Sequence, residues 1–163
     1  MGHTFNREVY KVGAYDDTFR CPVCDGTIIL SEVNSVSAMR PELTALWSAE
    51  NEMSPDETFY NRQSLVLWNC QECHGTYPMK ISDKTPDNTD CPYCNNIKLL
   101  PAFNDLRIVY PELASEWSSA NPDKPSEYLR TSPHKALWAC PTCHGEYVAR
   151  ICDRFVNDCI CPH

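Results

Sequence analysis

Apolar side chains recur at every fourth position in two separate stretches of the chain. The first stretch holds Met39, Leu43 and Trp47, and the second holds Val109, Leu113 and Trp117. Residues with this spacing lie on one face of a helix. Pro41 and Pro111 suit a first helical turn, and the glutamate after each lies near the positive end of the helix dipole. We therefore expect a short helix with an apolar face within residues 34–47 and 104–117.

A strand-like pattern follows each predicted helix. In the first unit, residues 65–68 read Leu-Val-Leu-Trp, which predicts a strand that leads into a cysteine pair. Residues 73–75, Cys-His-Gly, predict a turn, and residues 77–81 predict the returning strand. The connection at residues 51–58 is rich in Pro, Asp and Glu, which is typical of a solvated loop. Each unit should therefore contain a short helix and a β-hairpin.

The chain matches itself without a gap when Cys21 is placed on Cys91. The same shift superposes Cys70 on Cys140, Cys73 on Cys143, Cys91 on Cys161, Trp47 on Trp117, Trp68 on Trp138, and Tyr77 on Tyr147. Agreement across cysteines and aromatic residues predicts a tandem array. We expect a partial unit at residues 1–33, a complete unit at 34–103, and a unit at 104–163 that stops within its last cysteine pair.

The composition favours small modules that a metal stabilises. The 163 residues include 13 Pro and 11 Cys, and this much proline argues for many short elements. Domains of about 60 residues often need a metal or disulfides, and an odd cysteine count fits a closed disulfide framework poorly. The polar N-terminus lacks a secretory signal, and no stretch reaches the length of a membrane span. These features predict a cytoplasmic protein without membrane contact.

Cys-x-x-Cys pairs, called knuckles below, carry the metal chemistry. Cys70 and Cys73 form one knuckle, and Cys91 and Cys94 form another after the predicted returning strand. Two residues between cysteines let both sulfurs reach one ion, and structural zinc takes four thiolates in a tetrahedron. A thioredoxin-like redox pair would need a βαβ context that the pattern lacks. Zinc is therefore the predicted ion, although iron or an iron–sulfur cluster would use the same ligands.

The C-terminal site has fewer cysteines in matching positions. Cys140, Cys143 and Cys161 match the central ligands, but the fourth position falls one residue beyond His163. We expect His163 or Cys159 to substitute, or the true fourth cysteine to lie outside this sequence. Cys152 matches a serine and is predicted to be a bystander thiol.

The N-terminal knuckle also lacks its partner. Cys21 and Cys24 match a second knuckle, so a first knuckle should precede them. Residues 2–5 resemble the stretch after a first knuckle, which makes His3 either a third ligand or a solvated tail residue. The chain as a whole is then expected to hold two to three zinc ions. We expect it to be either a segment of a longer array or a protein whose terminal zinc sites are degenerate.

Several motifs together resemble a known family. They are Asn104-Asp105-Leu106, Pro111-Glu112-Leu113-Ala114-Ser115-Glu116-Trp117, Leu137-Trp138-Ala139-Cys140 and the closing Cys-Pro-x-Cys. From Gly2 onward the chain resembles a bacterial and phage family of zinc-ribbon, treble-clef-like domains that occur in tandem. The resemblance implies a small metal-stabilised α+β fold and, through restriction-type or very-short-patch-repair-like nucleases that accompany the family, a DNA-associated role. The order His74-Gly75 departs from the family's Gly-His, and the sequence contains no nuclease module.

The returning strands suggest a nucleic-acid face. Lys80 and Lys84 match Arg150 and Arg154, and their even spacing along a strand would place each pair on one face. Four aromatic residues nearby could offer stacking surface for bases: Trp68, Tyr77, Trp138 and Tyr147. The tryptophans, Trp47 and Trp117 included, are instead expected in the core, because so small a unit has little else to bury. Basic residues on a hairpin are also common as a merely solvated face.

The charge limits how strongly DNA can be bound. The formal net charge is −8, and each four-thiolate zinc site adds about −2, so a broad positive field is missing. The alternative function is a protein-interaction or spacer array. In one form of this hypothesis, its acidic loops mimic nucleic acid toward a basic partner. Catalysis is not expected, because the sequence lacks a Ser-His-Asp set, a His-Glu-x-x-His motif and a phosphate loop. No small-molecule substrate is predicted.

Overall fold

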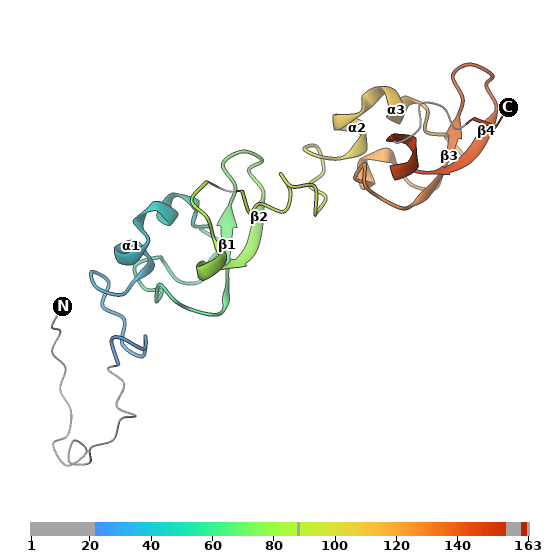
Figure 1. Cartoon of the computed structure of the whole chain (residues 1–163). Coiled ribbons are helices and arrows are strands. Elements are labelled where there is room, and N and C mark those ends of the chain that lie inside the picture. The colour runs from blue at the N-terminus through green and yellow to red at the C-terminus, as the bar shows by residue number, and fades with distance from the viewer. Residues whose placement is uncertain (1–21, 88, 156–160, 163) are drawn as a thin grey trace, which may run out of the picture.

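Two lobes, each containing one antiparallel hairpin, follow one another along the chain (Figure 1). The computed structural model describes residues 22–87, 89–155 and 161–162. The first lobe contains α1 (Val36–Met39), the 3₁₀ helix η2 (Pro41–Leu46), β1 (Leu65–Asn69), β2 (Thr76–Lys80) and the 3₁₀ helix η3 (Ile81–Asp83). The second contains α2 (Leu106–Val109), α3 (Pro111–Ser115), η4 (Pro125–Glu127), β3 (Lys135–Ala139), β4 (Glu146–Arg150) and η5 (Cys152–Phe155). The predicted small α+β modules in tandem are confirmed.

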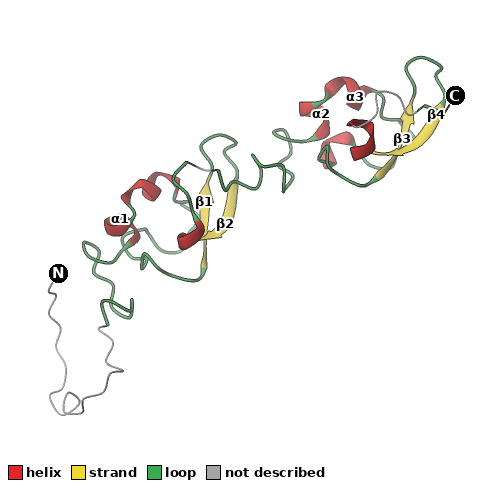
Figure 2. Ribbon diagram, in the orientation of Figure 1, coloured by secondary structure: helices red, strands yellow, loops and turns green. Residues whose placement is uncertain are grey.

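Short helical turns and long loops make up most of each lobe (Figure 2). Ser35 begins α1, because its side chain accepts a hydrogen bond from the backbone amide of Ala38. Asp105 begins α2 in the same way through the amide of Ile108. Among the described residues, no helix has the length and apolar character that crossing a bilayer requires.

The predicted helix at residues 34–47 is interrupted in the structure. Arg40 leaves the helical region with φ −137° and ψ 55°, and Pro41 starts a new helical turn with Glu42 beside it. Leu43 is fully buried, but Met39 is 48% exposed and its counterpart Val109 is 45% exposed. The expectation that Met39 and Val109 share one apolar helix face with the residues four positions later is wrong, because the backbone leaves the helical conformation at Arg40 and at Tyr110 between them.

The two hairpins have the same register, and their strands alternate between core and solvent. Trp68 lies opposite Tyr77 in one, and Trp138 lies opposite Tyr147 in the other. In β3, alternate residues starting at Ala136 point inward, and the residues between them point outward. The strands predicted from the sequence are therefore confirmed to within one residue at each end.

Tryptophan pairs form the centre of each core. Trp68 and Trp138 are both 0% exposed, and each donates its indole N–H to a backbone carbonyl of the returning strand at 3.1 Å. The rings of Trp47 and Trp117 meet them edge-on, with centroids 5.2 Å apart in both lobes. The core interpretation of these tryptophans is confirmed. With Tyr77 and Tyr147 also buried, these four aromatics provide no stacking surface for bases.

A buried cation lies over the inner tryptophan of each lobe. Lys84 is 2% exposed and pairs with Asp90 at 2.9 Å, with its Nζ atom 5.9 Å from the Trp68 ring centroid. Arg154 lies 4.8 Å above Trp138 and pairs with Glu116 at 2.5 Å. The expected strand-face positions of Lys84 and Arg154 are wrong, because β2 ends at Lys80 and β4 at Arg150. Both cations are neutralised inside their own lobes.

Removing the buried cation of the first lobe should destabilise the zinc-loaded protein. We expect Lys84→Met to lower the unfolding free energy by about 3 kcal/mol, because the Asp90 carboxylate would stay desolvated without its partner. The matched control Lys80→Met removes an exposed charge from the same segment and should change stability by less than about 0.5 kcal/mol. Chemical denaturation followed by tryptophan fluorescence measures both, and equal effects would contradict the buried role.

Candidate metal centres

The first lobe brings four cysteine sulfurs together. Cys70 and Cys73 lie in the turn between β1 and β2, and Cys91 and Cys94 come from the second knuckle. The sulfurs of Cys70 and Cys94 are 3.6 Å apart, as are those of Cys73 and Cys91, and all four lie within 4.8 Å of one another. A tetrahedron with Zn–S bonds of about 2.3 Å has edges of about 3.8 Å. The cluster therefore has the size of a four-thiolate zinc site, as predicted.

The two knuckles are fixed by their own backbone and by one tyrosine. Cys70 donates its amide to Gly75 O at 3.0 Å, and His74 adopts a positive φ of 57° to close the turn. A Cβ atom on Gly75 would lie 2.7 Å from the ring of Tyr93. The Tyr93 hydroxyl donates to Thr76 O at 2.9 Å. Gly75 is therefore required because the second knuckle packs directly on the first.

Burial and backbone amides act in opposite directions on the pKa values of Cys70 and Cys73. Burial raises the pKa of Cys70, but the amides of Cys73 and Glu72 facing its sulfur outweigh this, so its pKa lies below the usual value. Burial raises the pKa of Cys73 to about 11 and also raises the pKa of Cys94. The cluster alone therefore favours protonated thiols at two positions, and a divalent cation is needed to stabilise four thiolates there.

The second lobe provides three described ligands. The sulfurs of Cys143 and Cys161 are 3.5 Å apart, and both lie within 4.8 Å of the Cys140 sulfur. The amides of Cys143 and Thr142 lower the pKa of Cys140 to about 7. Cys143 is exposed, unlike its counterpart Cys73. The predicted fourth ligands, His163 and Cys159, lie outside the described residues.

Cys152 stands apart from this three-cysteine cluster. It lies in η5, where its sulfur is 3.6 Å from Asp153 Oδ1. No potential metal cluster among the described side chains includes it. That Cys152 is a bystander thiol stays a prediction.

The backbone of a second knuckle also occurs near the N-terminus. Asn34 Nδ2 donates to Val23 O at 2.6 Å and to Ile28 O at 2.9 Å. Asn104 Nδ2 repeats both bonds in the next unit, at 2.8 Å and 2.9 Å, to Tyr93 O and Lys98 O. Residues 22–34 therefore reproduce the hydrogen bonds that support the second knuckle of the central site. Of the predicted N-terminal ligands, Cys24 lies within this segment, and Cys21 and His3 lie outside the described residues.

Sequence reasoning missed the role of the two asparagines. Asn34 and Asn104 are 4% and 5% exposed, and each also accepts a hydrogen bond from a leucine amide at 2.7 Å. Each side chain thus ties one knuckle to the lobe that follows it. Their identity at matching positions of the repeat was the available signal, but sequence spacing does not show which backbone groups an amide side chain reaches.

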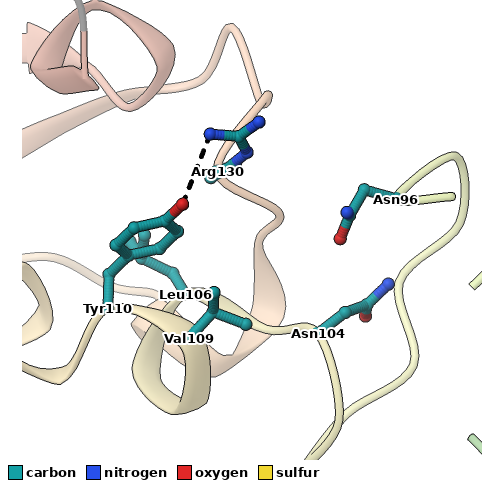
Figure 3. Close-up of a pocket in the computed structure, with 6 residues that line it drawn as sticks. All are labelled: Asn96, Asn104, Leu106, Val109, Tyr110 and Arg130. Carbon is teal, nitrogen blue, oxygen red and sulfur yellow. Dashed lines mark hydrogen bonds between the residues drawn. The ribbon is translucent and has the colours of Figure 1, made fainter. Parts of the chain in front are cut away.

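A shallow hollow of about 240 Å³ lies where the second knuckle meets the second lobe (Figure 3). Its lining residues are Asn96, Asn104, Leu106, Val109, Tyr110 and Arg130. Arg130 donates to the Tyr110 hydroxyl at 3.3 Å across it. The lining combines amides and apolar groups and contains neither a thiol nor a carboxylate, so it does not resemble a metal or acid–base site.

The four-cysteine assignment predicts different outcomes for two cysteine substitutions. Cys70→Ser should cost one zinc ion per chain and abolish cooperative unfolding of the first lobe, because metal affinity here is folding energy. Cys152→Ser should retain both the zinc content and the melting temperature. Metal analysis and thermal denaturation of the two variants measure this, and equal destabilisation would overturn the ligand assignment.

The repeated knuckle backbone predicts an additional ion at the N-terminus. We expect the full chain to bind three zinc ions and the Cys24→Ser variant to bind two. Cys152→Ser is again the control, since it removes a thiol without removing a predicted ligand. Mass spectrometry under native conditions counts the ions, and an unchanged count in Cys24→Ser would exclude the N-terminal site.

Comparison with known proteins places these centres in a family. No curated protein matches the chain. A family model described as "Probable Treble clef zinc finger domain" matches residues 43–97 and 113–163. Each matched region contains one hairpin and one of the two cysteine clusters described above. The chain therefore belongs to this treble-clef zinc finger family and carries two copies of the domain in tandem.

Proposed function

We propose that this chain is a non-catalytic, zinc-stabilised tandem module that associates with DNA through the outer faces of its hairpins. The observation that carries the proposal is the pair Lys80 and Arg150. They occupy equivalent positions at the ends of β2 and β4, and both are exposed. Neither forms an ion pair with another described residue. Both hairpins thus offer a positive charge without an ionic partner among the described residues at this same position.

The chemistry of the metal centres supports a structural role. A zinc ion held by four thiolates has no open coordination position for water or substrate. In the first lobe, all four ligands are cysteines, and three of them are buried. The ion would supply fixed geometry for the hairpin, and the hairpin would present its outer face to a partner.

The mode of binding should be contact with the DNA backbone. The four aromatic residues predicted to stack on bases lie in the two cores, so base stacking by them is not proposed. Phosphate contacts by exposed Lys and Arg position a protein on DNA without reading sequence. With a net charge of −8, such contacts must be local, and binding should be weak and sensitive to salt.

The wider setting of this function rests on family resemblance. Nucleases that accompany the family suggest a mobile-element, phage or defence-type system, in which the module would guide an attached or associated nuclease in the cytoplasm. This association is an analogy, and it assigns no activity to the chain itself.

Protein binding is the second candidate function. Met39 and Val109 are exposed at equivalent positions in the two lobes, and Leu65 and Val148 are exposed on the hairpins at 62% and 63%. Exposed apolar side chains that recur on each unit, as Met39 and Val109 do, are typical of a surface that docks a partner. Leu65 and Val148 add apolar surface at positions that do not correspond between the two hairpins. A scaffold or spacer array would use these residues in place of the basic ones.

A salt-dependent titration of labelled duplex DNA tests the DNA proposal. We expect zinc-loaded protein to bind at low salt with micromolar affinity. The double variant Lys80→Glu/Arg150→Glu should bind at least about tenfold more weakly, and its slope of log K against log salt should fall by about 2.

Lys98→Glu/Lys124→Glu is the control, because it makes the same charge change at exposed positions away from the hairpins. It should leave the slope nearly unchanged. No binding at low salt, or equal losses in both variants, would end the DNA proposal and direct the search to a protein partner.

A further inference from the structure

Two positive side chains lie directly opposite each other at one end of the second hairpin. Lys135 on β3 pairs in register with Arg150 on β4. Opposite residues of an antiparallel pair point to the same face, with Cβ atoms about 5 Å apart. Both residues are exposed and belong to the outward-facing sets of their strands. The two charges are therefore close together on the solvent side.

No acidic group within the described residues neutralises this pair. The ion pairs found there are Arg40–Glu42, Lys84–Asp90, His134–Asp123 and Arg154–Glu116. Asp123, the acidic partner of His134, also accepts a hydrogen bond from the Tyr128 hydroxyl. Glu127 and Asp153 lie closer in sequence to the hairpin strands, and neither forms an ion pair with a described residue. Glu146 lies on the same face of β4 but at its opposite end, where Ser118 donates to its carboxylate. Like charges directly opposite each other destabilise a hairpin.

The first lobe shows that the hairpin does not need this arrangement. Its register places Leu65 opposite Lys80, so one cation is replaced by an apolar side chain. The fold also has a way to neutralise a basic residue, as Arg154 shows through its bond to Glu116. An anion bound from outside would neutralise this pair, which is present in only one of the two otherwise matching hairpins.

We propose that Lys135 and Arg150 form a two-point clamp for a DNA phosphate, and that the second lobe makes the principal contact. This inference rests on the proposed DNA function. The Arg150 guanidinium can donate two parallel hydrogen bonds to phosphate oxygens, and the Lys135 ammonium adds a point charge. A phosphate between them removes their mutual repulsion.

The neighbouring residues suit the same ligand. Leu137 lies opposite Val148, next to the clamp on the outer face of the hairpin. Val148 is 63% exposed, so it presents an apolar surface beside the two charges. A deoxyribose that follows the clamped phosphate would contact this surface. The face therefore matches the alternation of charge and apolar sugar along a DNA strand.

Swapping the equivalent residues of the two hairpins tests the clamp. Lys135→Leu copies the first lobe, and we expect it to weaken duplex binding by about five- to tenfold at low salt and to reduce the salt slope by about 1. Its melting temperature should stay the same or rise, because the charge repulsion is gone. Leu65→Lys builds the pair in the first lobe and should strengthen binding. Lys124→Leu is the control for loss of one exposed charge.

The outcomes separate the clamp from the proposed function. If wild-type protein binds duplex and Lys135→Leu binds with the same affinity and slope, the clamp is overturned while the DNA function stands. If wild-type protein binds no duplex, the proposed function fails, and titration with inorganic pyrophosphate then judges the anion site. Pyrophosphate-induced changes in the NMR chemical shifts of residues 135 and 150 that are lost in Lys135→Leu would support an anion clamp for another ligand. If pyrophosphate causes no such changes in wild-type protein, the clamp is overturned.

Discussion

Convergence of cysteine sulfurs on a metal ion is the interaction on which each lobe depends. A hairpin of two short strands and a few helical turns buries only a small core around one tryptophan pair. The second knuckle contacts the hairpin through its sulfurs and, in the first lobe, through Tyr93, and Leu100 after it packs on the same core. Without a bound ion, burial would keep the thiols of Cys73 and Cys94 protonated, and the second knuckle would do little to offset the entropy lost on ordering the loops.

The two lobes place a cation over the core tryptophan by different means. Lys84 uses Asp90 from the segment before the second knuckle, whereas Arg154 uses Glu116 from the end of the helical region. The charged partners come from different parts of the unit, yet the two cations lie 5.9 Å and 4.8 Å from the centroid of the indole ring. Each core thus holds a positive charge over its inner tryptophan. Lys84 and Arg154, two of the four basic residues that suggested a nucleic-acid face, are explained by this internal role.

The asparagines at the unit boundaries explain how such small lobes form an array. Asn34 and Asn104 each bind the backbone of the preceding knuckle while standing at the start of the next lobe. A metal site and the following lobe therefore share one polar side chain. Because the same bonds recur at both boundaries, the junction is part of the repeat and is as regular as the hairpins. The exposed faces of the hairpins differ between the units, as the pairs Leu65–Lys80 and Lys135–Arg150 show. Differences in ligand binding between the lobes would therefore arise on these faces.

The sequence by itself determined the repeat, the strands and the cysteine ligands of the central site, because knuckle spacing and strand alternation are local patterns. It also predicted that Trp68 and Trp138 belong to the core. Only the tertiary structure decided that the helical region breaks at Arg40, which exposes Met39, and that Lys84 and Arg154 turn inward. Even spacing suggested a continuous strand, but the chain bends after Lys80 and Arg150. Burial of a charge depends on a partner such as Asp90 or Glu116, and only the folded chain shows which acidic residue reaches the cation.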